Sequence, residues 1–309
     1  MAVLTVTLSP WLTRVHRIMD PLRPGHTELV QGAHFECGGP GIHAAVAIRA
    51  LGGEARALYL AGGETGHLLT REVTAEGLEP VPVPAQVSTR MCWLLVTERE
   101  DGGAWRAYLE EMPRVTDHEA RQMLTAYTQE LERCDGVVLC DPSTAPATQF
   151  LFREMVALAR KARVPVLVDG TGPALREALA KGPNWVRVHR EDWEDAFAGE
   201  AAAEHPATVM PELFAAGIEA VVLTNGAGPV RVFTRDGEQR LVPPRIGVRR
   251  DCWSGDCMSG AMMLVRTEGW DLLPAVRFGM GAGAANAARL SLAGFKRSEV
   301  DGFMPQIQG

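Results

Sequence analysis

The fold of this chain is decided by one stretch, Arg250-Asp251-Cys252-Trp253-Ser254-Gly255-Asp256. Before it, residues 231–248 carry the residue types and turn signals of β-structure. After it, apolar residues recur at the spacing of one helix face: Met258, Ala261, Met262 and Val265. A short glycine-containing loop that opens a helix points several backbone N–H groups in one direction, and the helix dipole adds partial positive charge there. The stretch therefore predicts an anion site, most often one for phosphate.

Asp256, at the end of this stretch, has two interpretations. A carboxylate repels phosphate, so its position makes chemical sense if it takes a proton from a hydroxyl that attacks the phosphate. The other interpretation is structural, because an Asp at a helix start is commonly an N-cap that accepts a backbone hydrogen bond. The stretch alone leaves both interpretations open.

Composition narrows the class of protein. The 309 residues are 46% hydrophobic and 22% charged, as in a soluble globular protein of two domains or of one large α/β unit. A net charge of −7 without a basic block argues against nucleic acid or membrane as partners. The start of the chain lacks the features of a signal peptide, and no apolar run reaches the roughly 18 residues of a membrane span, so we expect a cytoplasmic protein. The cysteines lack C-x-x-C spacing, which favours free thiols over a disulfide framework or a zinc site.

Two separated segments near the N-terminus read as β-structure. Residues 11–37 are broken by Pro and Gly and resemble a small sheet or flap rather than a helix. Residues 89–97 and 104–109 read as a hairpin around the turn signal Asp101-Gly102-Gly103. We expect the two segments to form one small sheet. Between them, Gly38-Gly39-Pro40-Gly41 leads into a helix, which suggests close approach of the backbone to a ligand.

Further along, helices alternate with continuously apolar strands. This rhythm is typical of a mostly parallel sheet that is covered on both faces, with ligands bound beyond the carboxyl ends of its strands. The residues expected there are Asp141, Asp169, residues 189–192 and residues 224–228. The last long helix, expected over 274–292, carries small residues on one face, Gly279, Gly283 and Ala287. We expect it to pack closely against the helix of Asp256.

Several short motifs are spread over almost the whole chain. They are Thr7-Leu8-Ser9-Pro10, Gly38 to His43, Thr89-Arg90, Asp169 to Leu175, Thr224 to Gly228, and Ser254-Gly255-Asp256. In order and spacing they resemble the motifs of the ribokinase-like, PfkB-type carbohydrate kinases, nearest the 1-phosphofructokinase and tagatose-6-phosphate kinase branch. The resemblance implies a single ribokinase-like domain over residues 1–309, an α/β three-layer sandwich with a mostly parallel central sheet. It also implies a small β-sheet lid, inserted at approximately 11–37 and 87–112.

The resemblance also implies the chemistry. ATP, bound with Mg²⁺, would give its γ-phosphoryl group to a hydroxyl of a sugar or sugar phosphate. Asp256 would be the general base, and the amides of Trp253, Ser254 and Gly255 would stabilise the charge on the transferred group. For partners we expect the sugar or sugar phosphate, the nucleotide, and a second copy of the chain in a homodimer formed through the lid.

Further site residues follow from the same resemblance. The expected acceptor-binding residues are Thr13, Gly38, Gly39, His43 and Arg90. The expected nucleotide-binding residues are Arg187, His189, Thr224, Gly226, Gly228 and Asn286. Mg²⁺ would be held through water and acidic side chains near Asp192.

The chain departs from the family's motifs at five places. Thr13 stands where the family has an Asp that grips the sugar, Pro40 where it has a phosphate-anchoring Lys, and His43 where it has an Asn. Residues 189–192 replace Asn-x-x-Glu, and Trp253 replaces the first Gly of the anion loop, where it would stack over adenine or plug the loop. Such changes suggest an altered substrate or lost activity. The alternative function is therefore a catalytically weak or inactive homologue that binds nucleotide or sugar as a sensor or partner.

Overall fold

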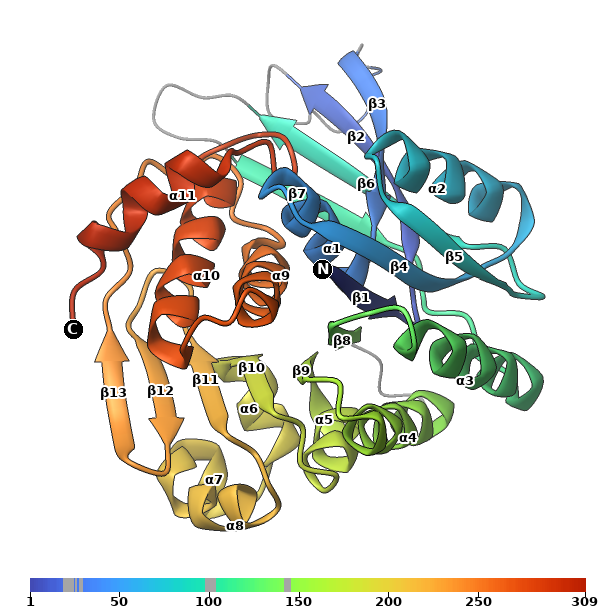
Figure 1. Cartoon of the computed structure of the whole chain (residues 1–309). Helices are drawn as coiled ribbons and strands as arrows, with labels where there is room; N and C mark the ends of the chain where they lie inside the picture. Colours follow the sequence, from blue (N-terminus) through green and yellow to red (C-terminus); the bar gives the residue numbers. More distant parts are fainter. Residues whose placement is uncertain (19–24, 26, 28–29, 98–103, 142–145) are drawn as a thin grey trace.

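The computed structural model describes the chain except residues 19–24, 26, 28–29, 98–103 and 142–145. Within the described residues it has a large sheet between two layers of helices, and a smaller sheet (Figure 1). The predicted α/β sandwich with a mostly parallel central sheet and a small second sheet is confirmed.

The large sheet explains the apolar strands of the sequence. Its strands are β1 (Ala2–Thr7), β4 (Glu54–Ala61), β5 (Glu79–Pro84), β8 (Gly136–Asp141), β9 (Val166–Gly170), β10 (Trp185–His189), β11 (Ala220–Thr224), β12 (Val230–Thr234) and β13 (Gly237–Leu241). Their order is β13-β12-β11-β10-β9-β8-β1-β4-β5. All neighbours from β11 to β5 pair in parallel, and only the β12 and β13 edge is antiparallel. The inner parallel strands β1, β8, β9, β10 and β11 are almost completely buried, which is why they lack a polar alternation, while the edge strand β5 is mostly exposed or half-buried.

Helices cover both faces of this sheet (Figure 1). One face carries α1 (Pro40–Ala50), α2 (Gly63–Ala75), α9 (Ser254–Thr267), α10 (Leu272–Ala287) and α11 (Arg297–Phe303). The other carries α3 (Asp117–Leu131), α4 (Pro146–Ala162), α5 (Gly172–Leu179), α6 (Arg190–Ala196), α7 (Ala201–Glu204) and α8 (Met210–Ala215). Two hydrophobic cores result, one on each side of the sheet. Among the described residues, every helix is too short or too polar to serve as a transmembrane span.

The predicted contact between the last long helix and the helix of Asp256 is confirmed. A Cβ atom on Gly279 of α10 would lie 3.0 Å from the carbonyl oxygen of Met258 in α9. One on Gly283 would lie 3.2 Å from the carbonyl oxygen of Ser254. The helices approach closely because these positions have no side chain. The short helices α6, α7 and α11 were not predicted, since four to seven residues are too few to display a helical period.

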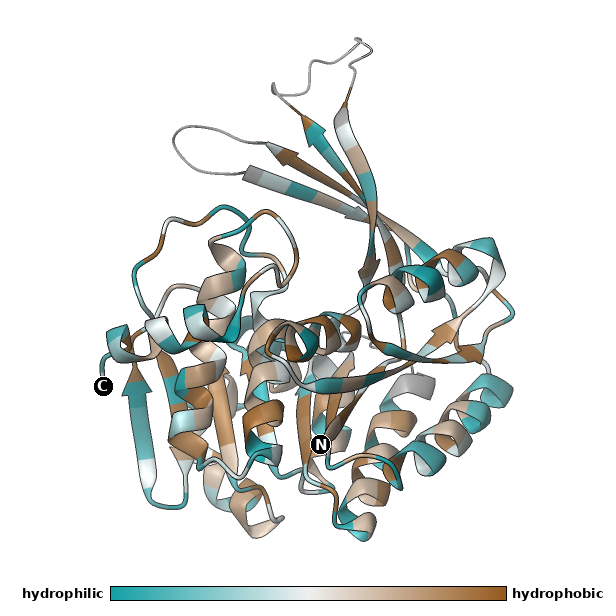
Figure 2. Cartoon of the chain, turned by 45° about the horizontal axis from the view of Figure 1, so that its top comes forward, coloured by the Kyte–Doolittle hydropathy of each residue, from teal (hydrophilic) through white to brown (hydrophobic). Residues whose placement is uncertain are grey.

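The smaller sheet joins the two N-terminal segments, as the sequence predicted. Its strands are β2 (Trp11–Ile18), β3 (Gln31–Gly38), β6 (Arg90–Thr97) and β7 (Ala104–Leu109), in the order β3-β2-β6-β7. The parallel pair of β2 and β6 joins the two segments. The turn predicted at residues 101–103 lies outside the described residues. Figure 2 shows this sheet, which we call the lid, standing out from the body of the molecule.

The base of the lid is packed onto the loop before α9. Val15, Leu94 and Val96, from β2 and β6, form a cluster with the indole of Trp253. On β7, the Trp105 Nε1–H donates a hydrogen bond of 2.7 Å to the Asp251 carboxylate. These contacts hold the lid against the same loop that the sequence marks as an anion site.

Candidate active site

The loop before α9 is held in an unusual backbone conformation. Trp253 is the N-cap of α9 and has φ 65° and ψ 11°, in the left-handed region that favours glycine. Ser254, Gly255 and Asp256 form the first helical turn, whose amides have no acceptor within the helix. The Ser254 amide donates to the Asp251 carbonyl at 3.3 Å. Because Asp256 is the third helical residue, the interpretation of Asp256 as the N-cap is wrong.

The Asp256 carboxylate instead contacts a histidine from α1. His43 Nδ1 lies 2.8 Å from Asp256 Oδ2, and the side chains are 0% and 15% exposed. His43 Nε2 lies 3.3 Å from the Gly39 amide, which can only donate. Nε2 must therefore be the acceptor, which leaves the ring proton on Nδ1, where it donates to Asp256. Burial raises the pKa of Asp256, with a further rise from Asp169, while the hydrogen bond from His43 opposes this shift.

Aromatic rings enclose the imidazole. The indole of Trp253 stacks on His43 with ring centroids 4.5 Å apart and planes at 30°. Trp11, from the start of β2, meets the same imidazole edge-on at 5.5 Å and 71°. Each indole lies under a guanidinium, Arg250 over Trp253 and Arg90 over Trp11, both at 5.2 Å from the ring centroid. The histidine beside the carboxylate is thus fixed in orientation and shielded from water.

The residues expected to bind the acceptor gather on this side of Asp256, but they are covered. Thr13 and His43 are completely buried. The Trp11 Nε1–H donates to the Thr13 hydroxyl at 3.1 Å. The indole also lies across Gly38, where a Cβ atom would be 2.2 Å from Nε1. Gly39, with φ 127°, is the N-cap of α1, and Pro40 occupies the first helical turn as the sequence predicted.

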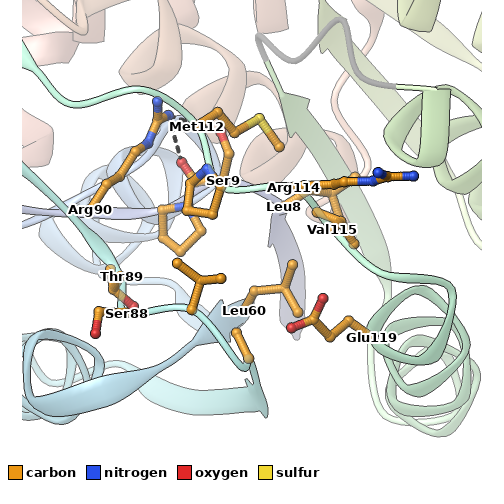
Figure 3. A pocket seen from close by; sticks show the side chains of 14 residues that line it. Leu8, Ser9, Leu60, Ser88, Thr89, Arg90, Met112, Arg114, Val115 and Glu119 are labelled. Carbon is orange, nitrogen blue, oxygen red and sulfur yellow. Dashed lines mark hydrogen bonds between the residues drawn. The ribbon is translucent and has the colours of Figure 1, made fainter.

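Arg90 has a structural environment in this conformation. Its guanidinium donates to the backbone and hydroxyl oxygens of Ser9 at 3.0 Å and to the carbonyl of Glu110 at 3.2 Å. Figure 3 shows the hydrogen bond between Arg90 and Ser9 at the edge of a small cavity. Thr89, Met112 and Glu119 also line this cavity. Its volume of about 30 Å³ is enough for a water molecule or two but not for a sugar.

A larger cavity of about 350 Å³ lies on the other side of the anion loop. One part of its lining is apolar and includes Val230, Pro243, Ile246, Val248, Met280 and Ala284. The remainder is polar and includes Arg187, His189, Thr224, Ser254 and Gly255. Trp105 extends the wall from the lid. An apolar region beside a cation and a helix N-terminus suits a purine base joined to phosphates.

Arg187 links this cavity to the anion loop. Its guanidinium donates to the Asp169 carboxylate at 2.9 Å and to the Thr224 hydroxyl at 3.0 Å. Burial opposes its charge, but the carboxylates of Asp169 and Asp256 outweigh that effect and raise the pKa of Arg187. A Cβ atom on Gly255 would lie 2.1 Å from Arg187 Nη2. The glycine is therefore required by the guanidinium that packs on it.

The other expected nucleotide residues divide into two groups. His189 and Gly226 line the cavity, and Gly226 has a φ of 53° in the turn after β11. Gly228 closes that turn through a 2.7 Å bond from its amide to the Asn225 carbonyl and is not part of the cavity lining. Asn286, on α10, is completely buried and also lies outside the lining. Its amide nitrogen donates to the Cys252 carbonyl at 3.2 Å and the Ser254 hydroxyl at 3.0 Å, so it braces the loop from behind.

Asp192 is the acidic side chain expected to assist Mg²⁺. It lies on α6, where burial and the neighbouring Asp169 raise its pKa. Asp169 is already bound to Arg187 and accepts a hydrogen bond from Ser259 at 2.7 Å. The described residues contain no cluster of three His, Cys, Asp or Glu side chains suited to a metal. One carboxylate fits Mg²⁺, because this ion usually combines one or two carboxylates with water and substrate phosphates.

Sequence reasoning missed several residues that shape the site. Trp11 covers the residues expected to bind the acceptor, Trp105 lines the 350 Å³ cavity, and Glu36 of β3 pairs with the fully buried Arg250 at 3.3 Å. Two-residue alternation along β2 and β7 could have placed both tryptophans on the inner face of the lid. No local pattern connects Glu36 to Arg250, which is 214 residues away.

The sequence and fold of the chain are similar to those of known carbohydrate kinases. A family model described as pfkB family carbohydrate kinase matches residues 11–295. ATP-dependent 6-phosphofructokinase isozyme 2 of Escherichia coli (strain K12) is 28% identical over 288 residues, covering 92% of this chain and 91% of that protein. The crystal structure of a possible 1-phosphofructokinase from Thermotoga maritima has a TM-score of 0.87 at 22% identity and covers 100% of this chain and 98% of its own. Phosphofructokinase-2 from Escherichia coli in complex with fructose-6-phosphate has a TM-score of 0.80 at 25% identity, with 98% of both chains covered.

Proposed function

Because the chain belongs to the pfkB family of carbohydrate kinases, we propose that it transfers the γ-phosphoryl group of ATP to a hydroxyl of a sugar phosphate or sugar. One observation carries the proposal. Asp256 stands between the nucleotide cavity, whose wall includes Gly255 and Arg187, and the lid side, where it contacts His43. A carboxylate at the junction of two substrate sites is positioned to act on a hydroxyl that attacks phosphate.

The proposed transfer moves one proton and one phosphoryl group. The acceptor hydroxyl gives its proton to the Asp256 carboxylate, and its oxygen forms a bond to the γ-phosphorus. The bond from that phosphorus to the bridging oxygen breaks, and ADP leaves with the electron pair. Arg187 and the amides of Gly255 and Asp256, in the first turn of α9, oppose the negative charge of the phosphoryl group during its transfer. Mg²⁺, held near Asp192, would supply further charge neutralisation on the phosphates.

The acceptor has to enter from the lid side. Thr13 and His43 have no exposed surface, and the indole of Trp11 covers Gly38. We therefore propose that the lid, or the Trp11 side chain, moves away to admit the acceptor and returns to exclude water during transfer. The contacts of the lid with Trp253 and Asp251 belong to the closed form.

The alternative of an inactive homologue gains no support from the described part of the site. The carboxylate, the buried cation, the open first turn of α9 and a cavity of nucleotide size are all present. Trp253 does not fill the nucleotide cavity, because its ring stacks on His43 on the opposite side of the loop. The departures from the family's motifs therefore favour an altered acceptor over a lost reaction.

A homodimer through the outer face of the lid is the assembly that we propose. Trp93 of β6 and Tyr108 of β7 are cross-strand partners and are 38% and 48% exposed. Exposed aromatic neighbours of this kind favour a protein–protein contact. Light scattering should give the mass of a dimer for the wild type and of a monomer for Trp93→Glu. A wild type that stays monomeric at micromolar concentration would contradict the assembly.

The proposed reaction is tested with an assay of ADP formation. The purified protein is given ATP, Mg²⁺ and, one at a time, free sugars and sugar phosphates that include fructose 6-phosphate and fructose 1-phosphate. We expect turnover with at least one acceptor. Asp256→Asn should lose about 10²–10⁴ of the rate, because the amide keeps the size of the carboxylate and can still accept from His43 but takes no proton.

Binding of the nucleotide separates a dead enzyme from a damaged one. Asp256→Asn should retain the thermal stabilisation that ATP with Mg²⁺ gives to the wild type, about 2.7 kcal/mol at 100 times the dissociation constant. Equal turnover in mutant and wild type would remove Asp256 from the mechanism. A wild type that binds no ATP and phosphorylates none of the acceptors would refute the kinase function.

A further inference from the structure

His43 and Asp256 are in direct contact, although the family's motifs do not predict a contact between these two positions. His43 stands where those motifs have an Asn that contacts the sugar, yet here its Nδ1 faces the carboxylate at 2.8 Å. It is completely buried, while the Asp256 side chain keeps 15% of its surface exposed. The accessible member of the pair is therefore the carboxylate, and the imidazole lies behind it.

The imidazole has little freedom to change its role. Nε2 accepts from the Gly39 amide, so protonation of this nitrogen would break that bond and place two N–H groups face to face. The stacked ring of Trp253 and the edge of Trp11 prevent the imidazole from turning over. Trp253 stands where the family's motif has a glycine, and its ring stacks on His43, which stands where the motif has an Asn. The two changes thus form one unit around the carboxylate.

The charged groups around this pair define what the histidine must do. Asp256, from α9, faces His43 of α1, Asp169 of β9 and Arg187 of β10. His43 in turn faces Glu36 of β3. Burial and the charge of Asp169 both disfavour an ionised Asp256, whereas a donor on Nδ1 and the charge of Arg187 favour it. Without the donor, Asp256 would keep its proton to a higher pH. At a given pH, a smaller fraction of the protein would then carry the ionised carboxylate that can act as a base.

We propose that His43 is a positioning residue for the catalytic base. Its Nδ1–H holds Oδ2 of Asp256, which keeps the carboxylate ionised and leaves Oδ1 to accept the proton of the acceptor hydroxyl. That proton stays on Asp256 until the product leaves, and His43 keeps its own proton throughout. The inference rests on the proposed kinase function, because it assigns a role within that reaction.

The first test measures how the turnover number depends on pH. His43→Leu removes the donor, and we expect the acid limb of kcat to move to higher pH by about one unit or more, with much of the rate regained on the alkaline side. His43→Asn places an amide N–H near the position of Nδ1, and we expect its acid limb to stay near that of the wild type. If His43→Leu does not fold, His43→Gln replaces it in the test. The amide nitrogen of Gln lies nearer the position of Nε2 than that of Nδ1, so this variant also removes the donor that faces Asp256.

A merely structural role predicts a different result. It would lower kcat by the same factor at every pH in each variant and leave the acid limb in place, and that outcome would overturn the proposal. A change confined to the KM of the acceptor would overturn it as well, because it would make His43 a substrate contact. The KM of ATP is expected to change less than twofold in His43→Asn.

The second test needs no turnover. In the ¹⁵N spectrum of the histidine rings, His43 is identified by the signal that His43→Asn loses. We expect its Nδ1 to carry the proton and its Nε2 to be the unprotonated acceptor, the reverse of the usual tautomer of free histidine. A proton on Nε2 would overturn the proposal. Absence of kinase activity in the wild type would overturn the proposed function and the catalytic role of His43, while the spectrum would still report whether the hydrogen bond exists.

Discussion

Gly255→Ala is the substitution for which the structure gives the sharpest expectation. The added methyl carbon would lie 2.1 Å from Nη2 of Arg187 and 2.4 Å from its Cζ and Nη1. A flexible side chain would ordinarily move aside at little cost. This guanidinium is held at both ends, by Asp169 at 2.9 Å and by Thr224 at 3.0 Å, so it can retreat only by giving up those bonds.

The cost follows from what those bonds contribute. Loss of a hydrogen bond to a charged group costs about 1.5–3 kcal/mol, and loss of a buried ion pair about 3–5 kcal/mol. A partial retreat of Arg187 should therefore cost about 2–4 kcal/mol, or roughly 30- to 700-fold in an equilibrium constant. Because Arg187 lines the cavity proposed to hold the nucleotide, part of this loss should appear in the dissociation constant of ATP, measured by calorimetry with Mg²⁺. The rest should appear as a lower melting temperature.

Two controls isolate the clash. Gly302→Ala adds the same methyl group on α11, where nothing lies within 4 Å, and should leave ATP binding unchanged while stability stays equal or rises by up to about 1 kcal/mol. In an Arg187→Met background the guanidinium is absent, so Gly255→Ala should add little further loss. A penalty of equal size in both backgrounds would show that the clash with Arg187 is not its cause.

Three further substitutions test other parts of the structure. Arg90→Lys should lower the melting temperature by a few degrees, because an ammonium cannot make the separate bonds of the guanidinium; an unchanged value would contradict its structural role. Trp253→Gly should destabilise the fold by about 1–4 kcal/mol. Loss of the ring packing on His43 costs about 3–5 kcal/mol, and relief of the left-handed backbone strain offsets about 1–2 kcal/mol of it. A variant more stable than the wild type would contradict this estimate. The hydrogen bonds and charges of Arg231 and, to a smaller extent, of Arg240 lower the pKa of Glu238 to about 2 from 4.5. The part of this stability that Arg231→Gln removes should be constant above about pH 5, shrink as the pH falls, and be nearly lost at about pH 2.

The sequence predicted the architecture well because periodicity reports burial. Strands that are buried on both faces are continuously apolar, and they alternate here with helices long enough to show a period. Spacing also predicted the contact of α10 with α9, since Gly279 and Gly283 lie on one helix face. Helix starts were less predictable. Helix α2 begins at Gly63 rather than near Leu68, because a φ of 63° at a glycine can open a helix without any capping side chain.

The site was predictable only in the part that lies in one stretch of chain. Gly255 and Asp256 follow from the loop and helix pattern, and Thr224 from its place at the end of a parallel strand, whereas Arg187, in the middle of β10, was expected only from the family resemblance. The partner of Asp256 is 213 residues away, and only the folded sheet brings α1 against α9. Nothing in the spacing of the sequence could show that Asn286 holds the loop before α9 from behind instead of lining the cavity proposed for the nucleotide.

The departures from the family's motifs are better explained by their contacts than by their number. Trp253 keeps a left-handed backbone, which costs about 1–2 kcal/mol beyond what a glycine would need. Strain of this kind persists where the surrounding structure holds the residue, and here the ring is held by His43, by Arg250 and by the lid. A chain that had lost its reaction would gain nothing from a strained tryptophan that fixes a histidine against a carboxylate. The strain is offset by a functional gain if that histidine holds the catalytic base. His43 and Trp253, the two residues that differ from the family's motifs here, are therefore the positions at which a retained reaction should be tested.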